Sequence, residues 1–385
     1  MKERTRLKEG FTTGTAFAAA VKGALALLLG GERPDRVRVD LPGSRTWTVP
    51  LHRLDLETEG RAVCTVIKDA GDDPDLTHGA EVGAVVEVGQ GPLEPGPCSS
   101  ILNINGLNII FIAGEGVGTV TRPGLPLPPG EPAINPGPRR LTGKVVREAV
   151  TEYNGLRPTD IVSLTAFVAR GKELAAKTLN PKLGIVGGLS ILGTTGVVRP
   201  YSHAAYRATI VVELRAARAS GLREVVLATG RTSERLAGEL LKAPDLALIR
   251  MGDHLSFCLR QAREEGFERV VVAAFFGKTV KMAQGSLDLR FDTAPMNLAP
   301  LAELTARLTE DRDLADSVAG ANTARMALEL LQAAKAGKVI QETARLAHLL
   351  CARILGDRVG SGYILFEPGG RVLYNYLTRP EESGG

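Results

Sequence analysis

Residues 224–276 are EVVLATGRTSERLAGELLKAPDLALIRMGDHLSFCLRQAREEGFERVVVAAFF, and this stretch decides the fold of the second half of the chain. Three short apolar runs, each long enough for one buried strand, alternate in it with two segments that have the apolar spacing of helices. The runs are 224–228, 246–251 and 269–276, and the helical segments are 233–241 and 255–265. Strands that alternate with helices through short loops predict βαβ units and a parallel sheet.

The same order extends in both directions from this stretch. Upstream, an apolar run at 183–192 precedes a helix at about 202–219. Downstream, three helical segments at about 298–307, 322–336 and 339–354 precede a strand pair around 363–376. We therefore expect residues 181–385 to form a Rossmann-like α/β domain, with the boundary at Asn180-Pro181.

Residues 1–180 have a less regular order, which predicts a separate α+β domain. An Ala- and Leu-rich helix from Thr15 to Leu29 ends at Gly30-Gly31. Seven prolines between Pro123 and Pro138 exclude a helix there and predict an extended loop. The other predicted elements are strands at 37–41, 62–67, 84–88, 107–113 and 161–168 and helices at 141–153 and 171–178.

The composition is that of a soluble globular protein. Of the 385 residues, 44% are hydrophobic and 23% are charged, which excludes disordered and fibrous chains. The formal net charge of +4 gives no reason to expect nucleic acid as a partner. The 47 basic residues comprise 34 Arg and 13 Lys. Arg suits carboxylate- or phosphate-rich ligands, but a GC-rich gene gives the same excess, and from composition alone we favour that explanation.

The cysteines and the N-terminus predict a cytoplasmic location. Cys64, Cys98, Cys258 and Cys351 are scattered without a C-x-x-C pair, so we expect buried thiols in a reducing compartment. The charged N-terminus leads into a Gly-rich segment that is unlike the core of a signal peptide. The most apolar stretch, residues 16–29, is interrupted by a lysine and is too short to span a bilayer, so we expect no membrane partner.

An apolar run at 108–113 leads into Gly114-Glu115-Gly116-Val117-Gly118, a G-x-G-x-G pattern. In Rossmann-type sites such glycines let the backbone approach an adenosine or a phosphate at the start of a helix. Here the proline passage follows, so an ordinary dinucleotide or Rossmann methyltransferase site is disfavoured. What remains is a glycine turn with one carboxylate, Glu115, beside a rigid proline loop with Asn135, Arg139 and Arg140. A purely structural turn explains the pattern equally well.

The segment 183–196, LGIVGGLSILGTTG, has the context that the first glycine pattern lacks. We expect a strand to run into the loop Gly193-Thr194-Thr195-Gly196 and a helix to begin near His203. Ligands of open parallel sheets bind beyond the carboxyl ends of the strands. The threonine hydroxyls and the glycine N–H groups are therefore candidate binding groups, and the alternative is that the glycines only permit close packing.

Residues 66–79, VIKDAGDDPDLTHG, place one lysine, four aspartates and one histidine in a single loop between strands. The spacing of the acidic residues is not that of a calcium loop. The loop could instead hold a cationic group, and the alternative is an Asx-rich turn with solvated charges.

Residues 10–16, GFTTGTA, place Thr12, Thr13 and Thr15 at the start of a helix. Hydroxyls and free N–H groups at a helix start form a generic anion cradle, and capping alone explains only one of the threonines. The five histidines contain no H-x-x-x-H pair, so we expect no metal site.

These segments, in this order and over most of the chain, resemble the cobalt-precorrin-5B C1-methyltransferase family of anaerobic cobalamin biosynthesis. The resemblance rests on GFTTGT at 10–15, DAGDDPDLTHG at 69–79, GEGVGTVTRPGL at 114–125, PAINP at 132–136, NPKLGIVGGLSILGTTG at 180–196 and GKTVKMA at 277–283. Two positions depart from the family pattern: Ala16 stands where members often have Cys, and His203 where an acidic residue is common. A reactive cysteine at the first position is thereby excluded.

The resemblance implies transfer of a methyl group from S-adenosylmethionine to ring carbon C1 of a cobalt-corrinoid substrate, cobalt-precorrin-5B, which gives cobalt-precorrin-6A. Arginines would pair with the acetate and propionate arms of this substrate, and an acidic cluster would accommodate the sulfonium cation. We predict catalytic roles for Asp72, Asp73 and Glu115. The predicted donor-binding residues are Gly114, Gly116, Gly118, Gly193, Thr194, Thr195 and Gly196. The predicted substrate-binding residues are Thr12, Thr13, Thr15, Asp69, His78, Arg122, Asn135 and Lys278.

Two other classes of function stay open on the sequence. The Thr/Gly segment at a helix start is compatible with a small-molecule kinase or another nucleotide-binding enzyme. A tetrapyrrole carrier without catalytic activity is the second alternative, and it would bind the corrinoid but not the methyl donor. The sequence does not decide the oligomeric state, and a homo-oligomer is compatible with it.

Overall fold

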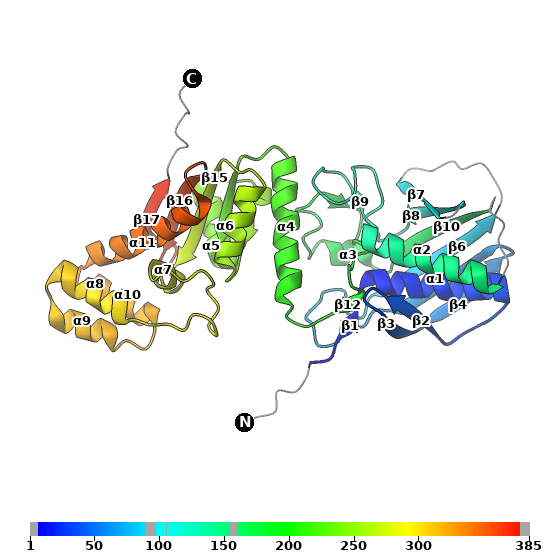
Figure 1. Cartoon of the computed structure of the whole chain (residues 1–385), viewed down its shortest axis with the longest axis horizontal. Helices are drawn as coiled ribbons and strands as arrows, with labels where there is room; N and C mark the ends of the chain where they lie inside the picture. Colours follow the sequence, from blue (N-terminus) through cyan, green and yellow to red (C-terminus); the bar gives the residue numbers. More distant parts are fainter. Residues whose placement is uncertain (1–6, 90–97, 105, 154–159, 378–385) are drawn as a thin grey trace, which may run out of the picture. The chain divides into compact units, whose positions relative to one another are not determined.

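The computed structural model describes residues 7–89, 98–104, 106–153 and 160–377, and the chain divides into two units, Met1–Ser202 and His203–Gly385 (Figure 1). This division corrects the predicted boundary at Asn180-Pro181. Residues 181–202 belong to the first unit because they pair with its strands: β11 (Ile185–Val186) pairs with β9 (Thr119–Val120), and β12 (Val197–Val198) pairs with β1 (Gly10–Phe11). The chain has a mixed α/β fold.

The first unit is built on a six-stranded sheet. Its strand order is β4 (Arg53–Thr58), β5 (Arg61–Ile67), β6 (Glu81–Gly89), β10 (Ile161–Val168), β8 (Leu107–Ala113) and β7 (Ser99–Ile104). Neighbouring strands are antiparallel except β10 and β8, which are parallel. A separate antiparallel hairpin, β2 (Arg36–Leu41) and β3 (Arg45–Pro50), precedes β4 in the sequence.

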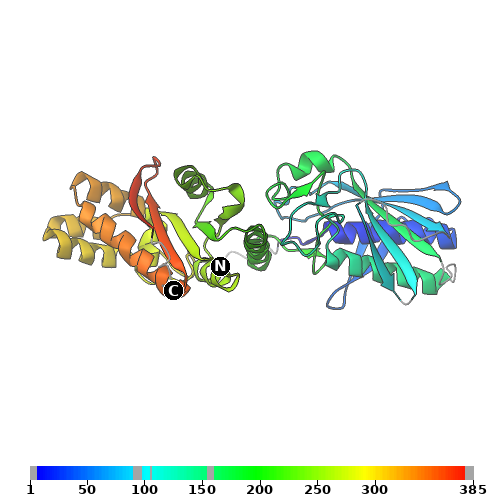
Figure 2. The ribbon, with the colours of Figure 1, turned by 90° about the horizontal axis from the view of Figure 1, so that it is seen from above.

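Two helices, α1 (Thr13–Gly30) and α2 (Pro136–Tyr153), cover one face of this sheet (Figure 2). Every second residue of β10 is buried against them, from Val162 to Val168. The Ala and Leu side chains of α1 form the centre of this core. Helix α2 begins at Pro136, inside the predicted proline loop, because the first turn of a helix needs no N–H donor from proline. The short helix α3 (Gly171–Ala175) follows β10.

By length and hydropathy alone, α1 could cross a membrane, which corrects the expectation that this apolar stretch is too short. In the structure, 78% of its 18 residues are buried inside the first unit, as in the core helix of a folded domain. Thr12 caps its start and Gly31, with a φ of 68°, ends it, so the predicted helix boundaries are nearly right.

The second unit is built on a five-stranded sheet. Its strand order is β14 (Leu248–Arg250), β13 (Glu224–Ala228), β15 (Arg269–Phe275), β16 (Gly360–Phe366) and β17 (Val372–Leu377). The first four strands are parallel and β17 is antiparallel to β16. The parallel sheet predicted from residues 224–276 and the predicted strand pair near the C-terminus are both confirmed.

Helices cover both faces of this parallel sheet. Helix α5 (Arg231–Leu241) packs on Val226 and Ala228. Helices α4 (His203–Ala219), α6 (Leu255–Glu264) and α11 (Gly337–Leu355) pack on one another and on strands β14 and β16. The 3-10 turn η1 (Asp245–Ala247) precedes β14. The helices between β15 and α11 are α7 (Phe276–Ala283), α8 (Ala299–Thr309), α9 (Arg312–Ala319) and α10 (Ala324–Ala333).

Candidate active site

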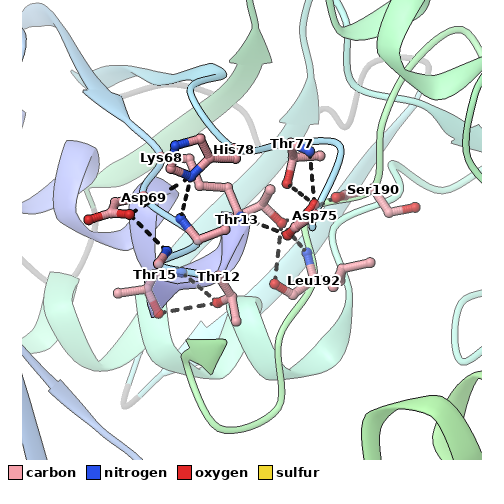
Figure 3. A network of polar contacts seen from close by, with 12 residues as sticks. Thr12, Thr13, Thr15, Lys68, Asp69, Asp75, Thr77, His78, Ser190 and Leu192 are labelled. Carbon is pink, nitrogen blue, oxygen red and sulfur yellow. Dashed lines mark hydrogen bonds and ion pairs between the residues drawn. The ribbon is translucent and has the colours of Figure 1, made fainter. Parts of the chain in front are cut away.

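The three threonines at the start of α1 bind the loop at residues 190–196 of the same unit (Figure 3). The Thr13 hydroxyl lies 3.3 Å from the carbonyl oxygens of Ser190 and Leu192, and it accepts a 2.9 Å hydrogen bond from the Leu192 N–H. The Thr15 hydroxyl is fully buried and donates to the Gly196 carbonyl at 2.8 Å. The predicted anion cradle is thus filled by the protein's own loop.

The loop Gly193–Gly196 does not have the context predicted for it. Residues 183–192 contain only the two-residue strand β11, which belongs to no parallel sheet, and helix α4 begins in the second unit. A Cβ at Gly193 would lie 2.3 Å from the Thr12 hydroxyl oxygen, and one at Gly196 would lie 2.6 Å from Leu41 Cδ2. Close packing against Thr12 at Gly193, and the positive φ of both residues (136° and 77°), explain why both positions are glycine.

The charged loop at residues 68–80 contains a buried ion pair. Lys68 is 1% exposed, and its ammonium group donates to Asp75 Oδ2 at 2.6 Å. The other oxygen of Asp75 accepts from the Thr77 N–H at 2.8 Å and from the Thr77 hydroxyl at 2.7 Å. Burial alone would raise the pKa of Asp75, but Lys68 and the Thr77 hydrogen bonds outweigh it, so this pKa is lowered. This part of the loop is held by its own charges.

The predicted site residues of this loop also have partners within the first unit. Asp69 accepts from Lys8 Nζ at 2.7 Å, which lowers the pKa of the carboxyl group. Asp72 accepts from the Lys8 N–H at 2.6 Å, and Asp73 accepts from the Tyr201 N–H at 3.2 Å. His78 is exposed, and its Nδ1 accepts from a backbone N–H, that of residue 70, at 3.0 Å.

The glycine turn at residues 114–118 lies where three backbone segments cross. A Cβ at Gly116 would lie 2.1 Å from the Val168 carbonyl oxygen, and one at Gly118 would lie 2.8 Å from the Gly188 carbonyl oxygen. The Gly116 carbonyl also accepts from the Leu189 N–H at 2.8 Å. The Glu115 side chain is exposed and has no hydrogen-bond or ion-pair partner in the described part of the chain. Among the acidic residues predicted for the site, Glu115 is thus the one whose carboxylate forms neither a hydrogen bond nor an ion pair with the described residues.

The proline passage supports this turn through backbone contacts. The Asn135 N–H donates to the Ile191 carbonyl at 2.9 Å, and the Asn135 carbonyl accepts the first hydrogen bond of α2. Arg139 pairs with Glu131 at 2.7 Å. Arg122 is exposed, and its stem packs on the backbone at residue 184. The segment 188–196 thus connects the glycine turn, the proline passage and the threonines of α1.

In the second unit, polar residues gather at the carboxyl ends of the parallel strands. The chain runs from β13 to β14 on one side and then returns to β15 on the other side, so the order of strands reverses between β13 and β15. Ligands of such sheets bind outside the carboxyl ends of the strands at this reversal. Thr229 and Gly230 follow β13, and Asp253 and His254 lie just after β14. Lys278 lies in the first turn of α7, the helix that directly follows β15.

Lys278 is the predicted site residue at this edge, and its neighbours were not predicted. It forms an ion pair with Asp253 and donates to the Leu289 carbonyl at 3.1 Å. His254 is buried, and burial together with the nearby Arg207 lowers its pKa. The signal that could have revealed these residues is their position directly after predicted strands of a parallel sheet.

A cavity of about 320 Å³ opens elsewhere in the second unit, between α7, α8 and α11. It is lined largely by apolar side chains such as Val280, Leu301 and Leu304, and no predicted site residue lines it. Within the described ranges, no group of three or more His, Cys, Asp or Glu side chains is placed to hold a metal ion. Three of the cysteines are buried free thiols, whereas Cys98 is only half-buried, contrary to expectation.

Comparison with known families shows the family of this chain. Residues 1–200 match the model of the family CbiD, and residues 288–376 match the model described as CbiD, C-terminal domain. The chain belongs to the CbiD family. The first match includes the threonines, the charged loop, the glycine turn and the loop at 190–196, so the elements described above for the first unit lie inside the family's own domain.

Relatives named for one enzyme match most of this chain. A relative from Brucella anthropi is 42% identical over 94% of this chain and 96% of its own, and it is named cobalt-precorrin-5B C(1)-methyltransferase. A relative with the same name from a Bradyrhizobium species is 42% identical over 95% of this chain and 93% of its own. Another, from Brucella canis, is 44% identical over 86% of this chain and 85% of its own. A crystal structure of a cobalamin biosynthesis protein from Archaeoglobus fulgidus is 27% identical, covers 70% of this chain and 78% of its own, and has a TM-score of 0.37.

Proposed function

We propose that this CbiD-family chain methylates ring carbon C1 of cobalt-precorrin-5B and so forms cobalt-precorrin-6A in anaerobic cobalamin biosynthesis. The observation that carries this proposal is the 42% identity to the Brucella anthropi methyltransferase over 94% of one chain and 96% of the other. Neither alternative class, a nucleotide-binding kinase or a tetrapyrrole carrier, has a counterpart among these relatives.

S-adenosylmethionine is the methyl donor that we propose. It carries the methyl group on a sulfonium. An electron-rich ring carbon can attack this methyl carbon in one in-line step, in which the methyl–sulfur bond breaks and S-adenosylhomocysteine leaves. Such a step needs positioning and electrostatic complementarity more than acid–base chemistry. We therefore propose no covalent enzyme intermediate.

Two sets of loops are candidates for binding the methyl donor. The first is the predicted set, Gly193–Gly196 and Gly114–Gly118, whose glycines are packed against the protein's own chain. The second is the loop after β13, where Gly230 has extended backbone and a Cβ would meet no atom within 4 Å. A Gly196→Val variant would collide with Thr15 and Leu41, so its folding must be measured before any loss of binding is interpreted.

Among the proposed catalytic carboxylates, Glu115 supports the role of a sulfonium partner best. It is exposed and unengaged, and a carboxylate attracts the sulfonium cation. Asp72 and Asp73 each accept a hydrogen bond from a backbone N–H at the rim of the charged loop. We propose that they fix the conformation of this loop and also contribute its negative charge.

The proposed substrate-binding residues fall into two groups. Thr12, Thr13 and Thr15 act through the loop that they hold, because their hydroxyls are bonded within the protein. The side chains of the other proposed residues are at least partly exposed, so they can meet the polar arms of the macrocycle directly. These residues are Asp69, His78, Arg122, Asn135 and Lys278.

Three coarser features complete the proposal. The parallel strand order and the helices on both faces favour a Rossmann-like classification of the second unit. The biosynthetic names of the relatives favour a cytoplasmic enzyme that acts on a small molecule, with neither nucleic acid nor membrane as partner. A homo-oligomer remains compatible with this proposal.

The experiment is a donor-consumption assay with purified full-length protein under anaerobic conditions. We expect S-adenosylhomocysteine to form only when cobalt-precorrin-5B is present. A parallel thermal-shift panel should show stabilisation by S-adenosylmethionine and by the corrinoid but not by ATP. Stabilisation by ATP alone would favour the kinase, and corrinoid binding without donor binding would favour the carrier.

A further inference from the structure

Five charged residues form a cluster beside the carboxyl edge of the second unit's sheet, which we call the lysine cluster: Asp253, Lys278, Lys281, Asp288 and Arg290. Lys278 pairs with Asp253, and Arg290 pairs with Asp288 at 2.9 Å. Lys281 forms no ion pair among the residues that the structure describes. These five side chains therefore carry one more positive charge than negative charge, and Asp292, which also acts on Arg290, lies near them.

Lys281 is the unusual member of this cluster. It is 6% exposed, and its ammonium group donates to the Leu289 carbonyl at 3.0 Å. The same carbonyl oxygen accepts from Lys278 Nζ at 3.1 Å, so two ammonium groups share one neutral acceptor. Burial, and next the charge of Lys278, lower the pKa of Lys281, and the nearby carboxylates of Asp253 and Asp288 raise it by less. Lysine is rarely buried without a carboxylate because its charge then lacks compensation.

The cluster is open to a ligand at Lys278 and Asp253. Their side chains are 32% and 35% exposed, so this ion pair faces solvent. An ion pair so exposed adds little to stability, and an incoming anion can replace Asp253 at small cost. Helix α7, which carries both lysines, directly follows β15, one of the two strands at the reversal of strand order. Ligands of parallel sheets bind beside this point.

We propose that Lys278 and Lys281 form a carboxylate-binding subsite, in which a ligand carboxylate displaces Asp253 from Lys278 and gives Lys281 the direct carboxylate contact that it lacks within the described chain. This inference rests on the proposed function, because both ligands of that reaction carry carboxylates. The macrocycle has acetate and propionate arms, and the methyl donor has the carboxylate of its methionine part. Binding of either would form charge-assisted hydrogen bonds to the two ammonium groups.

The test is isothermal titration of the full-length protein with two probes, cobyrinic acid and S-adenosylhomocysteine. The variants are Lys281→Met and Lys278→Met, which keep much of the aliphatic stem and remove the charge. Lys338→Met, at an exposed position on α11, is the matched control. For the probe that occupies the subsite, we expect each cluster variant to weaken binding about tenfold or more. The methyl ester of cobyrinic acid should bind the wild type and both variants equally.

Asp253→Asn gives a test of opposite sign. It removes the carboxylate that competes for Lys278, so the same probe should bind several-fold more tightly than to the wild type. A role in folding alone would not produce tighter binding. This variant and Lys278→Met also keep the proposal testable if Lys281→Met does not fold.

The two ligand sources and the proposed function are separated by the outcomes. A weakened affinity for cobyrinic acid supports the macrocycle as occupant, and a weakened affinity for S-adenosylhomocysteine supports the donor. Unchanged affinity of all cluster variants for both probes would overturn the inference, even in a protein that transfers methyl groups. Absence of methyl transfer by the wild type would instead contradict the proposed function and leave these binding results to stand by themselves.

Discussion

Lys68 in the first unit and Lys281 in the second are both buried, but only Lys68 forms an ion pair among the described residues. Lys68 is 1% exposed and is bonded to Asp75 at 2.6 Å. Lys281 is 6% exposed and is bonded only to a carbonyl that Lys278 also uses. A dense run of charges in sequence, such as residues 68–78, can thus be neutralised within the protein. A sparse pair of lysines on a short helix can leave a charge available to a ligand.

Lys68→Met should have the largest effect on stability. The substitution leaves the Asp75 carboxylate without its cation, and breaking one side of a buried ion pair typically costs 3–5 kcal/mol. Because the Asp75 side chain is 27% exposed, we expect about 2 to 3 kcal/mol. Urea unfolding of the full-length protein measures this cost. The control is Lys281→Met, which should lose less than about 0.5 kcal/mol because the Leu289 carbonyl keeps Lys278 as its donor. Equal losses in the two variants would remove the distinction between the lysines.

At acid pH, loss of the Asp75 charge should lower the free energy of unfolding by less than the Lys68→Met substitution does. Its pKa is lowered in the folded state, so the folded protein binds fewer protons there than the unfolded chain. This contribution to stability is complete above the unfolded value near 3.8 and is lost as the pH falls through the lowered pKa. In unfolding experiments as a function of pH, the difference between wild type and Asp75→Asn should therefore shrink toward zero at the acid end. A constant difference at all pH values would mean that the pair with Lys68 is not electrostatic in origin.

The smallest effect is expected at Lys281 on the alkaline side. Its pKa is lowered on folding, so the unfolded chain binds more protons there than the folded protein. This group disfavours folding most strongly below its lowered pKa, and stability relative to Lys281→Met should rise as the pH increases toward 10.5. The measurement is the difference in free energy of unfolding between the two proteins along this range. A difference that falls with pH would indicate an overlooked anion beside Lys281.

Local sequence patterns predicted the second unit well because its elements are set by local signals. The run 224–228 matches β13 residue for residue, since a β-branched run bounded by Gly and Arg has few alternatives. Strands β3, β4 and β7 were missed because polar and charged residues occupy much of them. The apolar run 183–192 was wrongly assigned to a parallel sheet. Leu189 and Ile191 of this run are buried in the core formed by distant parts of the first unit, whereas Val186 and Leu192 are exposed, and a local pattern does not show this.

The candidate site could be predicted in its residues but not in their contacts. The threonines of α1 were recognised as an unusual group, yet their partners Ser190 and Leu192 lie more than 170 positions away in the chain. The glycines at 116 and 193 fit a ligand loop and a backbone crossing equally well in sequence. Only the close approach of Val168 and Thr12 distinguishes the two. Lys281 was passed over because nothing in the sequence marks a buried lysine that lacks a carboxylate.

The central claim of this account is that the chain places a methyl group on carbon C1 of cobalt-precorrin-5B. The most direct test is to incubate the purified full-length protein anaerobically with cobalt-precorrin-5B and S-adenosylmethionine carrying an isotope-labelled methyl group, and to locate the label in the product by NMR. We expect one labelled methyl group per macrocycle, bonded to C1. A label on another ring carbon, or no transfer from a protein that binds both ligands, would contradict the claim.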